Sequence, residues 1–245
     1  MAAGEEGQLA LIKRPRIKHA FLALVGLALG LFSASRLADH YPDWNAPISS
    51  VERYSEASFA RWLGEDRQRR SEFAEFEQFL RKHQTSAVVP NWQLLRTDMN
   101  DRIGCARPAF LLPPRANWPN ILPALRLLKD HVIPAIGPVE VVSSYRTEAF
   151  NSCVNGAAQS RHLSFFALDL VATSGLDNRT LFSRLCRLQE RLGAVSRFGL
   201  GAYFDPARNG RNQQGRFHVD ATGFRSWGFS KKAATSGCRL LTKSD

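Results

Sequence analysis

The sequence predicts an α+β fold, and three features support this class. Short apolar runs with the alternation of β-strands occur among amphipathic helical stretches, without the regular order of a parallel α/β sheet. No internal repeat or low-complexity tract is present. The chain has 245 residues, 44% of them hydrophobic, which is enough for one sizeable core and an appendage.

An uncharged apolar stretch, residues 20–34, lies near the N-terminus and follows a group of basic residues: Lys13, Arg14, Arg16 and Lys18. This order is typical of an export signal. The basic flank predicts that residues 1–38 start in the cytoplasm and direct the remainder across the inner membrane. The stretch is shorter than the roughly twenty residues that span a bilayer, so a cleaved signal peptide and an uncleaved anchor stay open. We therefore expect a periplasmic or otherwise extracytoplasmic protein, anchored in the inner membrane or secreted.

A linker and a helical arm are predicted for residues 39–100. Pro42 and Pro47 lie in a polar stretch that follows the apolar segment. Aromatic and leucine side chains then recur at spacings of three and four across residues 55–81, which is the period of an amphipathic helix. Residues 101–245 are assigned to the domain that carries the chemistry.

The elements of this domain follow from local patterns. Residues 88–114 are rich in Pro, Asn and Arg and predict irregular structure. Helical spacing and the Pro and Gly residues beyond it predict helices at residues 119–132 and 178–192, with a helical turn at 147–155. Short apolar or alternating runs predict strands at residues 139–143, 167–172, 200–204 and 216–221.

Four cysteines follow the apolar segment: Cys105, Cys153, Cys186 and Cys238. Their spacing does not resemble the CxxC pairs of zinc sites. An even number in an exported chain is compatible with two disulfides, and three connectivities are possible. The alternative is that Cys186, within a predicted helix, is simply a small buried side chain.

The chain is strongly basic, with a net charge of +11 and a pI near 10.1. Such a balance favours anionic partners in general. The basic residues are dispersed, and the sequence contains no zinc-finger, RRM or basic-helix signature. Nucleic acid is therefore not an expected partner.

Three polar residues are candidates for a metal site. Asp169 interrupts an apolar strand, His162 precedes that strand in a loop, and His218 lies in a second predicted strand. Two imidazoles and one carboxylate, with a fourth position for water, form a usual catalytic zinc set. Asp220 shares a strand face with His218 and is the candidate general base. The alternatives are an Asp169 paired with an arginine, a surface histidine at 162, and a half-exposed polar strand face around 218.

The motifs and their order resemble the M15 peptidase family. The matching elements, in chain order, are Ser143-Ser144-Tyr145-Arg146-Thr147, Asn151, Gly156, Ser160, His162, Ala167, Asp169, Gly199-Leu200-Gly201-Ala202-Tyr203, Phe217-His218-Val219-Asp220 and Trp227. They cover about residues 139–228, and several linked elements in order are more specific than any one alone. The most similar branch contains zinc D-Ala-D-Ala carboxypeptidases and related murein endopeptidases.

The resemblance implies that His162, Asp169 and His218 bind zinc. It implies that Arg146 orients the substrate through a carboxylate of the stem peptide, and the alternative for this residue is a structural ion pair. It also implies a hedgehog-like or DD-peptidase-like fold, a small antiparallel sheet with packed helices and a zinc cleft.

Three further positions of the motif carry expectations. Ser160 is expected to shape the metal loop by hydrogen bonding. Tyr203 is expected either to line the cleft or to pack. Phe165 stands where the family usually has Gly, which predicts a remodelled metal loop if that position needs a positive φ.

The implied function is zinc-dependent hydrolysis of peptide bonds in peptidoglycan stem peptides or crosslinks, as a carboxypeptidase or an endopeptidase. One alternative is a non-catalytic peptidoglycan-binding module that keeps the fold. Another is a membrane-tethered scaffold that acts through the predicted helix at residues 55–81.

Overall fold

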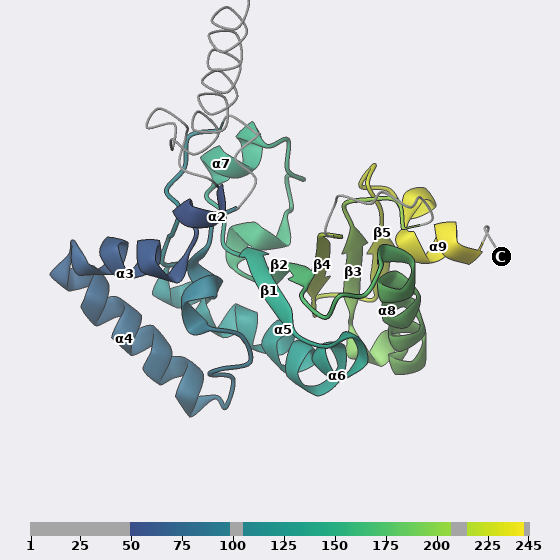
Figure 1. The fold of residues 1–245 in the computed structure, drawn as a ribbon, viewed down its shortest axis with the longest axis horizontal. Coiled ribbons are helices and arrows are strands. Elements are labelled where there is room, and N and C mark those ends of the chain that lie inside the picture. The colour runs from purple at the N-terminus through teal and green to yellow at the C-terminus, as the bar shows by residue number, and fades with distance from the viewer. Residues whose placement is uncertain (1–49, 99–104, 207–214, 243–245) are drawn as a thin grey trace, which may run out of the picture. The chain divides into compact units, whose positions relative to one another are not determined.

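Five short strands form one mixed sheet in the part of the chain that the structure describes (Figure 1). They are β1 (Val139–Ser143), β2 (Ala167–Ala172), β3 (Gly199–Ala202), β4 (Phe217–Asp220) and β5 (Arg225–Trp227). Their order is β1-β2-β4-β3-β5, and the neighbours are antiparallel except β3 and β5, which are parallel. The α+β class is confirmed, but the sheet is not wholly antiparallel, because the unpredicted strand β5 joins it in parallel.

The computed structural model describes residues 50–98, 105–206 and 215–242. None of the helices in these ranges is long and apolar enough to cross a membrane. The apolar stretch at residues 20–34 lies outside the described residues, so the predicted export signal or anchor stays a prediction.

Side-chain alternation gives the sheet one apolar and one polar face. Leu168 of β2 pairs with Val219 of β4, and Leu170 pairs with Phe217, so these fully buried side chains share a face. The intervening positions of the same strands carry the charged and imidazole side chains. The residues that build the core and those that carry chemistry are therefore separated by the pleat of the sheet.

Helices cover the apolar face of the sheet. Helix α8 (Asn178–Leu192) begins at the Asp177 cap, ends at Gly193 and places Phe182 edge-on to Phe217 of β4, with ring centroids 6.5 Å apart. The predicted helix at 119–132 is instead a series of short turns: η3 (Arg115–Ile121), α5 (Leu122–Leu127), η4 (Leu128–Val132) and α6 (Ile133–Ile136). Prolines explain the interruptions, since Pro119 lies inside η3 and Pro123 and Pro134 open α5 and α6.

The predicted helical arm is part of the same compact unit as the sheet. It consists of α2 (Ser50–Arg53), α3 (Glu56–Gly64) and α4 (Arg67–Lys82), and the Asp66 side chain caps α4. Phe59, Phe73, Phe76 and Leu80 are buried in one continuous core with the sheet residues. The contacts place Ile48–Asp245 in one unit, so the division predicted at residue 100 has no counterpart in the packing.

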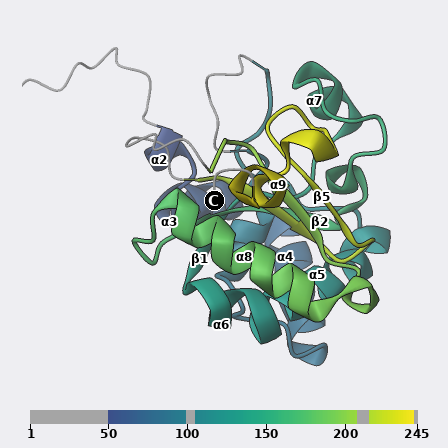
Figure 2. The same cartoon turned by 90° about the vertical axis from the view of Figure 1, so that its right-hand side faces the viewer.

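The remaining short elements are η1 (Asn91–Leu95), α7 (Glu148–Cys153), η5 (Arg161–Ser164), η6 (Ala194–Ser196), η7 (Ala233–Thr235) and α9 (Gly237–Thr242). Helix α9, which the sequence pattern did not predict, lies beside α8 and β5 (Figures 1 and 2).

The structure contains two disulfides, Cys105–Cys153 and Cys186–Cys238. The first ties the end of α7 to the segment that begins at residue 105, and the second joins α8 to α9. The structure therefore selects one of the three possible connectivities, and Cys186 is bonded rather than simply buried.

Candidate metal centre

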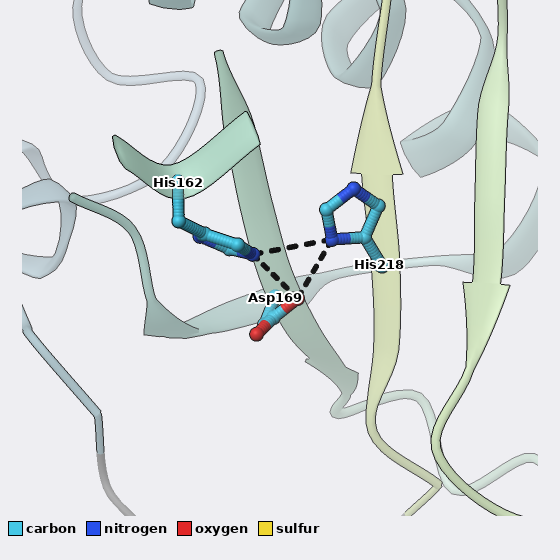
Figure 3. Close-up of side chains that lie close together, drawn as sticks. All are labelled: His162, Asp169 and His218. Atoms are coloured by element: carbon cyan, nitrogen blue, oxygen red, sulfur yellow. Dashed lines mark hydrogen bonds and ion pairs between the residues drawn. The ribbon is translucent and has the colours of Figure 1, made fainter. Parts of the chain in front are cut away.

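Three buried side chains, those of His162, Asp169 and His218, converge on the polar face of the sheet (Figure 3). The carboxylate Oδ1 of Asp169 lies 3.0 Å from His218 Nδ1 and 3.2 Å from His162 Nε2. The two histidine nitrogens lie 3.2 Å apart. All the predicted ligand atoms thus fall within 4.8 Å of one another, the spread expected of groups that could hold one ion.

Strand register places two of the three groups. Asp169 in β2 is directly opposite His218 in β4, and a register shift in β1 brings Ser143 opposite Asp169 on the other side. His162 comes instead from η5, whose backbone is tied to its surroundings. Its carbonyl accepts from the Arg146 backbone N–H at 3.1 Å, and its own N–H donates weakly to Ser160 Oγ at 3.4 Å. The contact fits the expected role of Ser160 in shaping this loop.

The partners of the two imidazoles decide which nitrogen carries a proton. His162 Nδ1 lies 2.5 Å from the backbone carbonyl of Ser144, which can only accept, so Nδ1 donates and Nε2 keeps its lone pair. His218 Nε2 donates to Asp220 Oδ2 at 3.0 Å, so Nδ1 faces Asp169 with a lone pair when the imidazole is neutral and with a proton when it is charged. When both imidazoles are neutral, two nitrogen lone pairs and the Asp169 carboxylate face one another, an arrangement that favours a cation, either a proton on His218 or a metal ion. The donor set fits a zinc ion.

The pKa shifts agree with this charge pattern. Burial lowers the pKa of His162 to about 4, so this imidazole is neutral at physiological pH. Burial opposes ionisation of Asp169, but His162 and Arg216 outweigh it and hold its pKa well below the usual range. Burial also lowers the pKa of His218, but hydrogen bonds to Asp169 and Asp220 raise it overall, which shows that positive charge is favoured at this point.

Asp220 does not reach the pocket, and the geometry does not support its predicted role as general base. Its oxygens accept from His218, from the Arg225 guanidinium at 2.6 and 3.1 Å, and from Thr222 at 2.6 and 2.8 Å. The side chain is fully buried behind the imidazole, on the side away from Asp169. Strand alternation put Asp220 on the correct face, but its carboxylate is used to orient His218.

The glycines of the motif on β3 leave room for this support. A Cβ at Gly199 would lie 2.3 Å from Asp220 Oδ2, and one at Gly201 would lie 2.1 Å from the Trp227 ring. Trp227 in turn packs against the His218 imidazole, with ring centroids 5.3 Å apart. Any larger residue at these two positions would displace a group that fixes His218.

Tyr203 both lines the pocket and contacts a proposed metal ligand. Its hydroxyl donates to Asp169 at 2.9 and 3.0 Å, and its ring packs edge-on to Trp227. Burial and the nearby Asp169 carboxylate raise the pKa of Tyr203, so the hydroxyl stays a neutral donor. Both alternatives stated for this residue hold at once.

Arg146 lines the pocket and is also paired within the protein. Its Nη2 donates to Asp169 Oδ2 at 2.7 Å and to Asp98 Oδ2 at 3.3 Å, while Nε and Nη2 donate to Ser143 Oγ. None of the hydrogen bonds that it makes with the described residues uses Nη1. The ion pair and a substrate contact are therefore compatible.

Two residues of the site were missed by the sequence analysis. Asp98 and Arg216 form a bidentate pair at 2.9 Å, and Arg216 also donates to Asp169 Oδ2 at 2.6 Å. Alternation could have found Arg216, because it precedes His218 by two residues and shares its face. Asp98 had no such signal, since it lies within the stretch predicted to be irregular, residues 88–114.

Phe165 occupies the position where the resemblance expects Gly, and it does adopt a left-handed conformation, with φ 60° and ψ 34°. His162 reaches the cluster from this loop, and the predicted remodelling of the loop stays a prediction. The phenyl ring is fully buried and lies 6.2 Å from the ring of Phe76 in α4. Core packing against the N-terminal helix stabilises a backbone conformation that is unusual for Phe.

A pocket of about 610 Å³ opens over the cluster and includes His162 and His218 in its lining. The described part of this lining holds five basic side chains: Arg146, Arg161, Arg216, Arg225 and Lys231. Its one carboxylate is Asp98. Arg146, Arg216 and Arg225 pair with Asp98, Asp169 and Asp220, so the positive charge that would suit an anionic ligand comes from Arg161 and Lys231.

Comparison with known proteins supports the resemblance drawn from the motifs. The family model described as Peptidase M15 matches residues 92–201. The match includes Arg146, His162 and Asp169 and ends before His218. No curated protein and no solved structure matches the chain. Residues 92–201 of this chain are thus similar to the M15 peptidase family.

Proposed function

We propose that the protein is a zinc-dependent peptidase that hydrolyses peptide bonds in peptidoglycan stem peptides or crosslinks. The observation that carries this proposal is the convergence of two histidine nitrogens and one carboxylate beneath a pocket, in a chain whose residues 92–201 match the M15 peptidase model. His162, Asp169 and His218 would hold the ion. Zinc in such a site polarises a carbonyl and lowers the pKa of bound water.

Arg146 would orient the substrate. Ser143, Asp98 and Asp169 fix its Nε and Nη2, while Nη1 is not used by the described residues. A guanidinium held in this way can donate to a substrate carboxylate without losing its own position. The other basic side chains of the pocket would favour the same charge, which stem peptides carry.

One observation favours the alternative of a non-catalytic peptidoglycan-binding module. In the described part of the pocket lining, Asp98 is the one carboxylate, and both its oxygens accept from Arg216. Asp220 is turned away behind His218. A general base with free access to the pocket is thus not evident among these side chains, and binding without turnover is the second candidate function.

The expected location follows from the predicted signal at residues 1–38, which would place the remaining chain outside the inner membrane, where peptidoglycan lies. A C-terminal alkaline phosphatase fusion should then be active. An inactive phosphatase together with an active cytoplasmic reporter at the same site would refute this location.

The decisive experiment is digestion of purified muropeptides by the zinc-loaded full-length protein, with products identified by mass. Loss of a terminal D-Ala indicates a carboxypeptidase, and separation of crosslinked dimers indicates an endopeptidase. The His218→Ala variant is the control and should give neither product. Muropeptide binding with stoichiometric zinc but no product would support the non-catalytic alternative, and absence of both zinc and product would refute the proposal.

A further inference from the structure

A buried ion-pair quartet lies beside the proposed metal ligand Asp169. Asp98 binds Arg216 through both carboxylate oxygens at 2.9 Å and Arg146 through Oδ2 at 3.3 Å. The same two arginines donate to Asp169 Oδ2, at 2.6 Å and 2.7 Å. Asp98 is 2% exposed and Asp169 is fully buried, so water does little to screen these charges.

The quartet is electrically balanced. Two guanidinium groups carry two positive charges, and two carboxylates carry two negative ones. Asp169 alone could not balance both arginines, because one carboxylate carries a single negative charge; its Oδ1 faces the histidine nitrogens, and its Oδ2 receives both Arg146 and Arg216. Without Asp98, one uncompensated positive charge would lie next to a site that must accept a dication.

Hydrogen bonds fix the backbone of Asp98 and of its neighbour Thr97. The Arg107 guanidinium donates to its backbone carbonyl at 2.9 and 3.2 Å. The neighbouring Thr97 carbonyl accepts from Ser143 Oγ at 2.6 Å, and that hydroxyl also accepts from Arg146. Thr97 and Asp98 thus connect to Arg146, the same arginine that donates to the proposed metal ligand Asp169.

We propose that Asp98 is the counter-ion that keeps Arg146 and Arg216 on the outer oxygen of Asp169, and so sets the zinc affinity of a site to which it supplies no ligand. This inference rests on the proposed zinc site. Asp98 is a positioning residue, because it acts through the two arginines and not on the ion. Through Asp98, the segment before η3 would thus contribute indirectly to metal binding.

The first test is the Asp98→Asn variant of the full chain, which keeps the shape of the side chain and removes its charge. Zinc affinity, measured by competition with a chromophoric chelator, is expected to fall about 10- to 100-fold. Glu140→Gln is the matched control, because Glu140 pairs at 2.7 Å with the buried Arg96, away from the cluster. This control should bind zinc as the unaltered chain does.

The second test restores the charge balance. The double variant Asp98→Asn, Arg216→Gln removes one charge of each sign and should bind zinc more tightly than Asp98→Asn alone. A residue that only supports the fold would give losses that add or grow in the double variant. If Asp98→Asn does not fold, the double variant still tests the inference. Its two remaining charges, on Arg146 and Asp169, balance each other, so the inference predicts a folded chain that binds zinc.

Unchanged zinc affinity in Asp98→Asn would overturn the inference, as would a double variant weaker than the single one. An equal loss in Glu140→Gln would also overturn it, by showing a general effect of charge removal. A failure of the proposed function is distinct: zinc binding without hydrolysis would refute only the proposed peptidase activity, and an unaltered chain that binds no zinc would refute the proposed site and this inference together.

Discussion

The metal cluster joins two regions that are built in different ways. Asp169 and His218 lie on neighbouring strands and meet because β2 and β4 pair in register. His162 lies in η5, a loop turn whose position depends on the left-handed Phe165 and its ring against Phe76 of α4. The strand ligands are fixed by hydrogen bonding within the sheet, whereas the loop ligand is fixed by packing against a helix nearly ninety residues earlier in the chain.

The two imidazoles differ in the same way. His162 is oriented by a backbone carbonyl, that of Ser144. His218 is oriented by the Asp220 side chain, which Arg225 and Thr222 hold in turn. A substitution can therefore remove the orienting group of His218 but not that of His162. Separate substitutions in the loop and in the strands can test the two regions one at a time.

The largest expected effect is on the loop region, through Phe165→Ala. Loss of a fully buried phenyl ring costs roughly 3–5 kcal/mol of unfolding free energy, and the alanine keeps the unfavourable positive φ. Phe165→Gly should be milder than Phe165→Ala by about 1 kcal/mol, because glycine accepts this conformation without a Cβ penalty. Denaturant unfolding of both variants measures the difference.

Phe182 in α8 supplies the matched control, since it is buried as deeply but has helical backbone angles. There the order should reverse, with Gly costing about 1 kcal/mol more than Ala. If Phe165 follows the same order as Phe182, the left-handed turn is not what holds the loop.

Metal removal gives the next effect. A chelator should lower the free energy of unfolding by about 4 kcal/mol relative to the chain in free zinc at a thousand times its dissociation constant. The two regions should respond differently, because the pairing of β2 with β4 does not need the ion. Amide hydrogen exchange is expected to quicken in residues 156–165 and to change little in β2 and β4. Equal protection losses in both regions would show that the strand ligands also depend on the metal.

The same contrast explains what the sequence could predict. Strands β1 and β2 have the predicted bounds, and alternation placed His218 and Asp220 on one face of their strand, because strand geometry is local. The orientation of the Asp220 carboxylate was not predictable, since it depends on Arg225 from the unpredicted strand β5. The function of Asp98 and the burial of Phe165 against Phe76 depend on contacts between segments far apart in the chain, which no local pattern records.

The smallest expected effect concerns the strand region, through Asp220→Asn. The change is nearly isosteric, but it removes the charge that Arg225 and His218 share. An amide can also turn its NH₂ group toward His218 Nε2, which would move the imidazole proton to Nδ1 and remove a lone pair from the cluster. Zinc affinity should therefore fall about 10- to 100-fold, or roughly 1.4–2.7 kcal/mol.

Asp177→Asn, at the exposed cap of α8, is the control for that substitution and should leave zinc binding unchanged. Hydrogen exchange in residues 156–165 should also stay unchanged in Asp220→Asn, because His162 is oriented from Ser144 and not from the sheet partner of His218. A variant that keeps full zinc affinity but loses turnover of muropeptides would reverse this assignment. Asp220 would then serve as the proton acceptor that strand alternation first suggested, after a movement that frees it from Arg225.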